Sequence, residues 1–260
     1  MSDPAERLAG VVALVTGSST GTGAAIAREL ARARARVAVH HRRSRDAAEG
    51  IAGAIRAAGG EAAVFQADVA VGTDVQRLVD EVSATLGPIG VLVNNAGPFD
   101  GTPFRTLSET AWDYILDTNV KAVHLATQRA VPGMERLGWG RVVNIGATSG
   151  FVRSHSVYGL AKAALLHLTE GLALELAPLI TVNAVVPSQI ASARTDGMPI
   201  YKTAAIAGTP LGRLVTEDEI ARMVRLVCSP AFDFVTGRAI VMDGGRTLPT
   251  FPSLTLTPDV

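Results

Sequence analysis

The sequence has few of the residues that cross-link small extracellular domains or anchor a chain in a bilayer. Its 260 residues include one cysteine, Cys228, which excludes an internal disulfide and suits a reducing compartment. The most apolar stretch, residues 165–186, is interrupted by His167, two glutamates and Pro178, so it is a poor membrane span. The first eight residues lack the apolar segment of a secretory signal. We therefore expect a soluble cytoplasmic protein that does not interact with membranes.

An excess of charge of one sign is missing too. The chain carries 24 Lys and Arg against 24 Asp and Glu, so no long-range field favours nucleic acid or an anionic surface. No His, Cys, Asp and Glu residues gather at metal-ligand spacing, and we expect no metal. These absences favour a small molecule as the binding partner.

What the sequence does contain is a regular alternation of short β-branched runs and alanine-rich helical stretches. This alternation is typical of a parallel sheet covered on both faces, and it predicts one doubly wound α/β domain over residues 1–260. The seven expected strands cover residues 11–15, 37–40, 62–65, 91–94, 141–145, 181–185 and 239–242. The expected helices lie near residues 22–33, 46–57, 74–86, 108–136, 158–177 and 217–228.

Two stretches fit neither pattern. Residues 187–212 have weak periodicity, contain three prolines and exceed the usual length of a loop, which is typical of a lid over a substrate. Residues 247–260 also contain three prolines and predict an extended tail that packs against a neighbouring subunit. We expect a homo-oligomer, either a tetramer or a dimer.

A glycine-rich turn follows the first expected strand and opens the first expected helix. Gly17, Gly21 and Gly23 let the backbone and the amino end of the helix approach a pyrophosphate. A tight turn alone also needs glycine, but the strand-turn-helix context favours a dinucleotide site.

The end of the second expected strand indicates which dinucleotide binds. An acidic residue would bind the ribose 2′-hydroxyl of NAD at this point, whereas the chain continues from His40 as HHRRSR. Arg42, Arg43 and Ser44 suit a 2′-phosphate instead. The segment therefore predicts NADP(H) as the cofactor, the alternative being a solvated basic turn.

Tyr158 and Lys162 stand four residues apart in a helical stretch. Positions i and i+4 share one face of a helix, so the ammonium can lie beside the phenol. We expect the lysine to draw the pKa of the phenol from about 10 toward neutrality. The pair is then a candidate general acid or base, although an isolated pair of this kind is more often an exposed helix surface.

As a set, these motifs resemble the short-chain dehydrogenase/reductase family. The set also includes NNAG at 94–97, Asn119 in the long expected helix, and VMDGG at 241–245. The basic segment after His40 and VLVNNAGPF at 91–99 are most similar to the NADP-dependent members, which include the 3-oxoacyl carrier-protein reductases and the pteridine reductases. The resemblance implies a Rossmann-type fold and an NADP-dependent oxidoreductase, a ketoreductase acting on CH–OH or C=O groups.

The resemblance also implies a role for each matching residue. Tyr158 would donate a proton, Lys162 would bind the nicotinamide ribose, and Asn119 would hold a water that links Lys162 to solvent. Asp68 and Val69 would flank the adenine. Further implied cofactor contacts are Gly17, Ser19, Gly21, Thr22, Gly23, Asn95, Ala96, Gly97, Pro187, Ile190 and Ser192.

The chain departs from the family at the end of the fifth expected strand, where a catalytic serine is usual. Residues 145–150 read IGATSG, and alignment on Gly150 puts Ala147 at the serine's position. Thr148 or Ser149 could supply the missing hydroxyl, or both are turn residues. Arg153 and His155 lie in the following loop and are candidate substrate contacts.

The function that follows is reduction of a small-molecule carbonyl, such as a ketone, an oxoacyl group or a quinone, with Tyr158 as the proton donor. One alternative is a catalytically silent NADP-binding sensor or scaffold, which the altered serine position would explain. Another alternative keeps the cofactor and reduces an enone or a pteridine-like imine.

Overall fold

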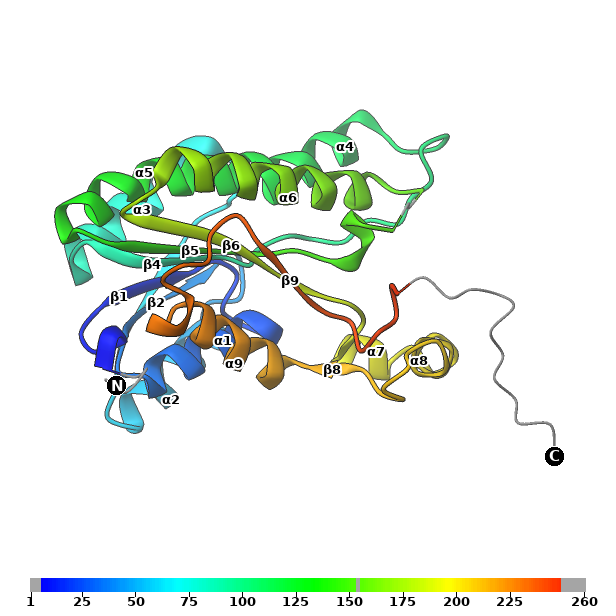
Figure 1. Ribbon diagram of the computed structural model, residues 1–260, viewed down its shortest axis with the longest axis horizontal. Coiled ribbons are helices and arrows are strands. Elements are labelled where there is room, and N and C mark those ends of the chain that lie inside the picture. Colours follow the sequence, from blue (N-terminus) through cyan, green and yellow to red (C-terminus); the bar gives the residue numbers. More distant parts are fainter. Residues whose placement is uncertain (1–5, 153–154, 249–260) are drawn as a thin grey trace.

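Seven parallel strands form the centre of the computed structural model, which describes residues 6–152 and 155–248 (Figure 1). They lie in the order β3-β2-β1-β4-β5-β6-β9. Their bounds are β1 (Val12–Val15), β2 (Arg36–His41), β3 (Glu61–Gln66), β4 (Ile89–Asn94), β5 (Gly140–Ile145), β6 (Ile180–Pro187) and β9 (Ala239–Met242). The order changes direction between β1 and β4, and ligands bind beyond the carboxyl ends of the strands at such a point. The predicted doubly wound fold is confirmed.

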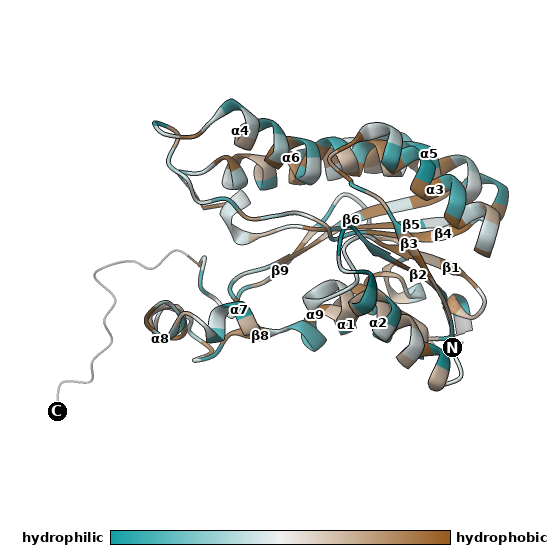
Figure 2. Cartoon of the chain, turned by 180° about the vertical axis from the view of Figure 1, so that it is seen from behind, coloured by the Kyte–Doolittle hydropathy of each residue, from teal (hydrophilic) through white to brown (hydrophobic). Residues whose placement is uncertain are grey.

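Helices cover both faces of this sheet (Figure 1). One layer contains α1 (Gly21–Arg32), α2 (Arg45–Ala57) and α9 (Glu217–Val227), and the other contains α3 (Gly72–Leu86), α5 (Ala122–Leu137) and α6 (Val157–Leu176). Successive strand residues point to opposite layers: in β1, Ala13 and Val15 join the first core cluster, and Val12 and Leu14 join the second. Because the inner strands are buried on both sides, they are mostly apolar, as Figure 2 shows.

The expected helix over residues 108–136 is not one regular helix. It begins as α4 (Glu109–Leu116), where the Ser108 hydroxyl accepts a hydrogen bond from the Ala111 N–H at 3.2 Å. A π-helical segment, Asp117–Lys121, then separates α4 from α5. This wider turn carries Asn119, and such segments are frequent at functional sites.

The expected lid, residues 187–212, is folded rather than a loop. It contains the short strand β7 (Ile190–Ala191) and the helices α7 (Ala193–Asp196) and α8 (Pro199–Ala207). Strand β7 pairs with β8 (Val215–Thr216) in a small separate sheet. These elements lie beyond the end of β9, at the same end of the molecule as α4 (Figure 1).

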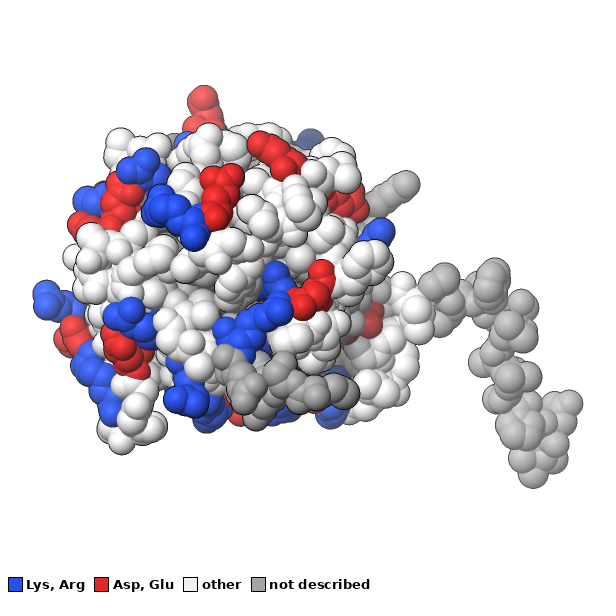
Figure 3. Space-filling view, turned by 60° about the vertical axis from the view of Figure 1, so that its left-hand side comes forward, with Lys and Arg blue, Asp and Glu red and all other residues white. Residues whose placement is uncertain are grey.

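Charges of both signs are mixed on the face shown in Figure 3, in keeping with the balanced composition. No helix in residues 6–152 and 155–248 is long and apolar enough to cross a membrane. Most of the expected tail, residues 249–260, lies outside the described residues.

Candidate active site

The turn between β1 and α1 folds back so closely that glycine is required. Gly17 has a φ of +65°, in the left-handed region that favours glycine. At Gly23 a Cβ atom would lie 2.3 Å from the Gly17 carbonyl oxygen and 2.5 Å from the Asn95 amide nitrogen. The Thr20 side chain makes no cap on α1, so N–H groups of its first turn stay open to a ligand. A cradle of this kind suits a pyrophosphate.

Residues after β4 hold this turn in place. The Asn95 side chain donates to the carbonyl oxygens of Thr16 and Gly17, at 2.9 and 3.2 Å. The Thr16 hydroxyl in turn accepts from the backbone N–H groups of Asn95 and Ala96, both at 3.0 Å. Two predicted segments that are far apart in the sequence are therefore joined at the carboxyl edge of the sheet.

The buried side chain of His40, in β2, also fixes the turn. Its Nδ1 accepts from the Gly17 N–H at 2.8 Å, and its Nε2 lies 3.1 Å from the Ala67 carbonyl oxygen. A ring that accepts at one nitrogen and donates at the other is neutral, and burial lowers the pKa of His40 to about 4. This role could not be predicted from the sequence, where His40 stands at the start of a basic segment.

A cavity of about 530 Å³ opens beside the turn. The predicted cofactor residues that line it are Gly17, Ser19, Arg42, Arg43, Ser44, Asp68, Val69, Asn95, Ala96 and Gly97. The other predicted turn residues, Gly21, Thr22 and Gly23, lie in the first turn of α1. The structure thus brings residues from four strand ends to one cavity.

The two arginines at this cavity differ in their partners. Arg42 bonds to the Tyr114 hydroxyl at 2.5 Å and lies 3.7 Å from an Asp68 carboxylate oxygen. Arg43 is exposed, and no described carboxylate lies within ion-pairing distance of it. Arg43 is therefore the freer of the two cations for an anionic group.

Tyr158 and Lys162 share one face of α6, as their spacing predicts. The Lys162 ammonium lies 5.5 Å from the centre of the Tyr158 ring and donates to the Ile145 carbonyl oxygen at 2.8 Å. Lys162 is 4% exposed, so this is not a surface pair.

The pKa of the phenol moves in the direction opposite to that expected. Burial raises the pKa of Tyr158 to about 12, and the Arg194 guanidinium opposes part of that rise. Burial also lowers the pKa of the Lys162 ammonium to about 8. The expectation that the lysine would bring the phenol toward neutrality is wrong for the protein alone, because desolvation dominates. Tyr158 therefore keeps its proton at neutral pH.

Asn119 lies beside this pair. Its amide nitrogen donates to the Ile115 and Pro98 carbonyl oxygens at 3.1 and 3.3 Å, while its side-chain oxygen is buried without a partner. A Cβ atom at Gly97 would lie 2.3 Å from that oxygen and 3.3 Å from the Lys162 ammonium. Asn119, Gly97 and Lys162 are thus in close contact, and an unpaired oxygen remains for a hydrogen-bond donor.

The chain after β5 is a short 3₁₀ turn, Thr148–Gly150, packed on α6. Ala147 precedes it with an extended backbone. Thr148 is buried, and the Ser149 hydroxyl is buried without a hydrogen-bond partner. The turn that carries both residues is packed on α6, and which hydroxyl contacts a substrate stays a prediction.

A second cavity has a volume of about 310 Å³, and Tyr158 contacts one of its wall residues without lining it. Phe99 is part of its wall, and the Phe99 ring meets the Tyr158 ring edge-on at 5.1 Å. The predicted residues Ile190 and Ser192 also line it, whereas Pro187 ends β6. Of the predicted substrate contacts, His155 is exposed and lines neither cavity, and Arg153 lies outside the described residues.

Comparison with known proteins identifies the family. Residues 17–247 match the family profile described as Enoyl-(Acyl carrier protein) reductase. The chain belongs to the short-chain dehydrogenase/reductase family. A 3-oxoacyl-[acyl-carrier-protein] reductase FabG of Staphylococcus aureus is 36% identical over 237 residues, 90% of this chain and 96% of that protein. The predicted resemblance is confirmed, and the chain is an oxidoreductase.

Solved structures of this family have the same fold. A blue fluorescent protein from a metagenomic library, in complex with NADPH, has a TM-score of 0.86 at 33% identity. The alignment covers 92% of this chain and 99% of the fluorescent protein. A gluconate 5-dehydrogenase from Burkholderia cenocepacia, in complex with NADP and tartrate, has a TM-score of 0.87 at 29% identity. That alignment covers 94% of this chain and 97% of the dehydrogenase.

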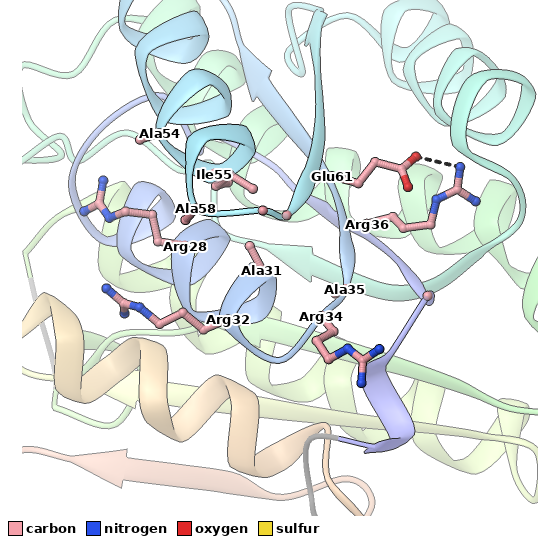
Figure 4. A pocket seen from close by; sticks show the side chains of 13 residues that line it. Arg28, Ala31, Arg32, Arg34, Ala35, Arg36, Ala54, Ile55, Ala58 and Glu61 are labelled. Atoms are coloured by element: carbon pink, nitrogen blue, oxygen red, sulfur yellow. Dashed lines mark ion pairs between the residues drawn. The ribbon is translucent and has the colours of Figure 1, made fainter.

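A further cavity, of about 640 Å³, lies away from Tyr158 and Lys162, where β2 and β3 begin (Figure 4). Four arginines line it, but Arg36 pairs with Glu61 at 2.7 Å and Arg32 pairs with Glu29 at 3.0 Å. Figure 4 shows that the arginine side chains point in different directions rather than toward one centre. Within the described part of this short-chain dehydrogenase/reductase, no three His, Cys, Asp or Glu side chains are placed to hold a metal.

Proposed function

We propose that the protein is an NADPH-dependent reductase of a small-molecule carbonyl, with Tyr158 as the proton donor. The observation that carries this proposal is the partly buried Tyr158 beside the buried Lys162, with Tyr158 packed against Phe99 in the wall of one cavity and Lys162 close to Gly97 in the wall of the other. Gly97 and Pro98 line the first cavity and Phe99 lines the second, so three consecutive residues connect them. The first cavity has the features of a dinucleotide site and the second has room for a small substrate.

The residues present fit NADP(H). The glycine turn leaves a cradle that a Cβ atom would fill, and Arg43 offers an unpaired cation at the place where a 2′-phosphate would bind. Asp68 and Val69 would flank the adenine. The other proposed contacts are Gly17, Ser19, Gly21, Thr22, Gly23, Arg42, Ser44, Asn95, Ala96, Gly97, Tyr158, Lys162, Pro187, Ile190 and Ser192. When bound, this cofactor supplies the hydride.

The chain's own residues donate the proton and stabilise the group that remains. Tyr158 donates its phenolic proton to the carbonyl oxygen while the carbonyl carbon gains the hydride, so that an alcohol and the oxidised cofactor result. The Lys162 ammonium stabilises the phenolate that is left. The unpaired oxygen of Asn119 is close enough to the Lys162 ammonium to hold a water that returns the proton.

Two alternatives remain open to the same test. A silent NADP-binding protein would not need a lysine kept charged at 4% exposure, which costs folding free energy. Reduction of an enone or imine would use the same cofactor site with another acceptor. The two cavities and the tyrosine support a reductase in general. Which group the protein reduces, a carbonyl, an enone or an imine, distinguishes the remaining hypotheses.

The test is NADPH and NADH oxidation against a panel of ketones, quinones, enones and pterins. We expect carbonyl reduction with NADPH to be preferred, because Arg42 and Arg43 follow β2 at the place where an NAD-binding chain has an acid. Replacing both arginines with alanine should raise the KM for NADPH at least about tenfold, since charged hydrogen bonds are worth roughly 1.5–3 kcal/mol each, and leave the KM for NADH nearly unchanged. Equal use of NADH by the wild-type protein would contradict the cofactor assignment.

We also propose a homo-oligomer. Apolar side chains on α4 and α6 are exposed in the single chain, among them Trp112, Leu160 and Leu174, and such patches often mark subunit contacts. Light scattering at several concentrations would distinguish a dimer or tetramer from a monomer. The cytoplasmic location expected from the sequence stays a prediction.

A further inference from the structure

One cation at the second cavity has no partner. Arg194 comes from α7 and lines this cavity, whose wall residue Phe99 contacts Tyr158. Among residues 6–152 and 155–248, no carboxylate lies within ion-pairing distance of its guanidinium. The acidic residue nearest in the sequence, Asp196, is already paired with Lys202 at 2.7 Å. The positive charge of Arg194 is therefore left uncompensated at the cavity.

Arg194 is connected to the proposed proton donor through one aromatic ring. Its guanidinium carbon lies 4.7 Å from the centre of the Phe99 ring, and Phe99 meets Tyr158 edge-on. This stacking orients the planar guanidinium while leaving its N–H groups free to donate. The charge of Arg194 also opposes the rise in the pKa of Tyr158, in keeping with this proximity.

The rest of the cavity suits a small, partly polar ligand. Phe99, Ile190, Met198 and Tyr201 form apolar and aromatic walls. Gln189 also lines the cavity, and its side-chain oxygen is buried without a hydrogen-bond partner. A volume of about 310 Å³ admits a compact molecule rather than a bulky one. The cavity thus combines apolar contact with one free cation.

We propose that Arg194 binds a carboxylate of the substrate, so that the preferred substrates are small keto acids. The proposal rests on the proposed reductase function and names its substrate class. A carboxylate matches the guanidinium with two parallel hydrogen bonds. The reducible carbonyl then lies at Tyr158, and the carbon chain between the two groups runs along the Phe99 ring.

The experiment compares keto acids with their methyl esters, which have nearly the same shape but no charge. Pyruvate, 4-oxopentanoate and 5-oxohexanoate, each with its ester, cover three chain lengths. We expect wild-type kcat/KM for at least one acid to exceed that of its ester by about tenfold or more, since a charge-assisted pair contributes at this level. Arg194→Gln should lower kcat/KM for the acid about 10–100-fold and change the ester less than about threefold. Arg194→Lys should recover part of the loss.

The matched control is Lys202→Gln, which removes a cation of the same segment that is already paired. It should leave the preference for the acid unchanged. Equal loss for acid and ester in Arg194→Gln, or no wild-type preference in any of the three pairs, would overturn the proposal.

Calorimetric titration of the NADP⁺-bound protein with 4-oxopentanoate separates this proposal from the proposed function, because it needs no turnover. Binding that Arg194→Gln weakens and Lys202→Gln leaves unchanged supports the carboxylate contact even if no carbonyl is reduced. Binding that is the same in wild type and Arg194→Gln contradicts it.

Discussion

Burial sets the protonation state of the key residues. Tyr158 and Lys162 both lie in a low-dielectric environment that disfavours charge, which raises one pKa and lowers the other. At neutral pH this leaves a protonated phenol next to a lysine that is still mostly charged. That combination suits a proton donor in reduction. The Tyr158 phenol carries the proton to be donated, and the Lys162 ammonium can stabilise the phenolate that forms.

A residue-scale prediction concerns the hydroxyls after β5. If Thr148 or Ser149 donates to the substrate carbonyl, Thr148→Val or Ser149→Ala should lower kcat by about 10²–10³-fold with little change in NADPH affinity. The effect is expected because one oriented donor is lost from a water-poor site. Steady-state kinetics on one accepted ketone, with Ala147→Ser alongside, would measure it. Wild-type rates in both variants would exclude each hydroxyl as an essential donor.

At the scale of elements, strands and motif residues could be predicted and contacts between distant side chains could not. All seven strands of the main sheet were predicted, because strands buried on both faces form short apolar runs with clear ends. The strands β7 and β8 were missed, because a strand of two residues is too short to show an alternation of apolar and polar side chains. The π-helical turn at Asn119 was also missed, because sequence periodicity does not reveal a local change in the hydrogen-bonding pattern.

The candidate site divides in the same way. Gly17, Gly23, Tyr158 and Lys162 were predicted because their roles depend on local spacing. The role of His40 was missed because it depends on a partner far away in the sequence, the backbone N–H of Gly17. The local sequence pattern therefore predicts the type of chemistry. The residues that position the site through tertiary contacts become visible only in the structure.

The tightness of the glycine turn gives an element-scale prediction. Gly23→Ala should weaken NADPH binding at least about tenfold and lower the melting temperature, because its Cβ would clash with the Gly17 carbonyl and move the start of α1. Gly50→Ala is the matched control, since Gly50 lies in α2 with no atom within 4 Å of an added Cβ. It should stabilise the fold by roughly 0.5–1 kcal/mol and leave NADPH binding unchanged. Unchanged NADPH affinity in Gly23→Ala would contradict the assigned cradle.

At the scale of the whole molecule, His40 links folding stability to pH. Its pKa in the folded state is about 4 against 6.5 for the free side chain, so the unfolded chain binds more protons between these values. Stability should therefore fall as the pH drops below 6.5, with His40 contributing about 2 kcal/mol to the loss between pH 7.5 and pH 5. His40→Asn should show a smaller loss over this range, although it starts less stable at pH 7.5.

Urea unfolding at the two pH values would measure this effect. His167→Asn is the control for the loss of a histidine, because the His167 side chain is 92% exposed and lies on α6, away from the glycine turn. An identical loss of stability in wild type and His40→Asn would show that His40 is not kept neutral by the fold.

The central claim is that the protein reduces a carbonyl with NADPH while Tyr158 donates the proton. The most direct measurement is alcohol formed per NADPH consumed, in wild type and Tyr158→Phe, with the NADPH Kd of each measured separately. The account predicts equimolar alcohol and NADP⁺ in wild type, a rate lowered by about 10²–10⁴-fold in Tyr158→Phe, and nearly the same Kd. A Tyr158→Phe enzyme that keeps most of its rate, or a wild-type enzyme that consumes NADPH without forming alcohol, would contradict it.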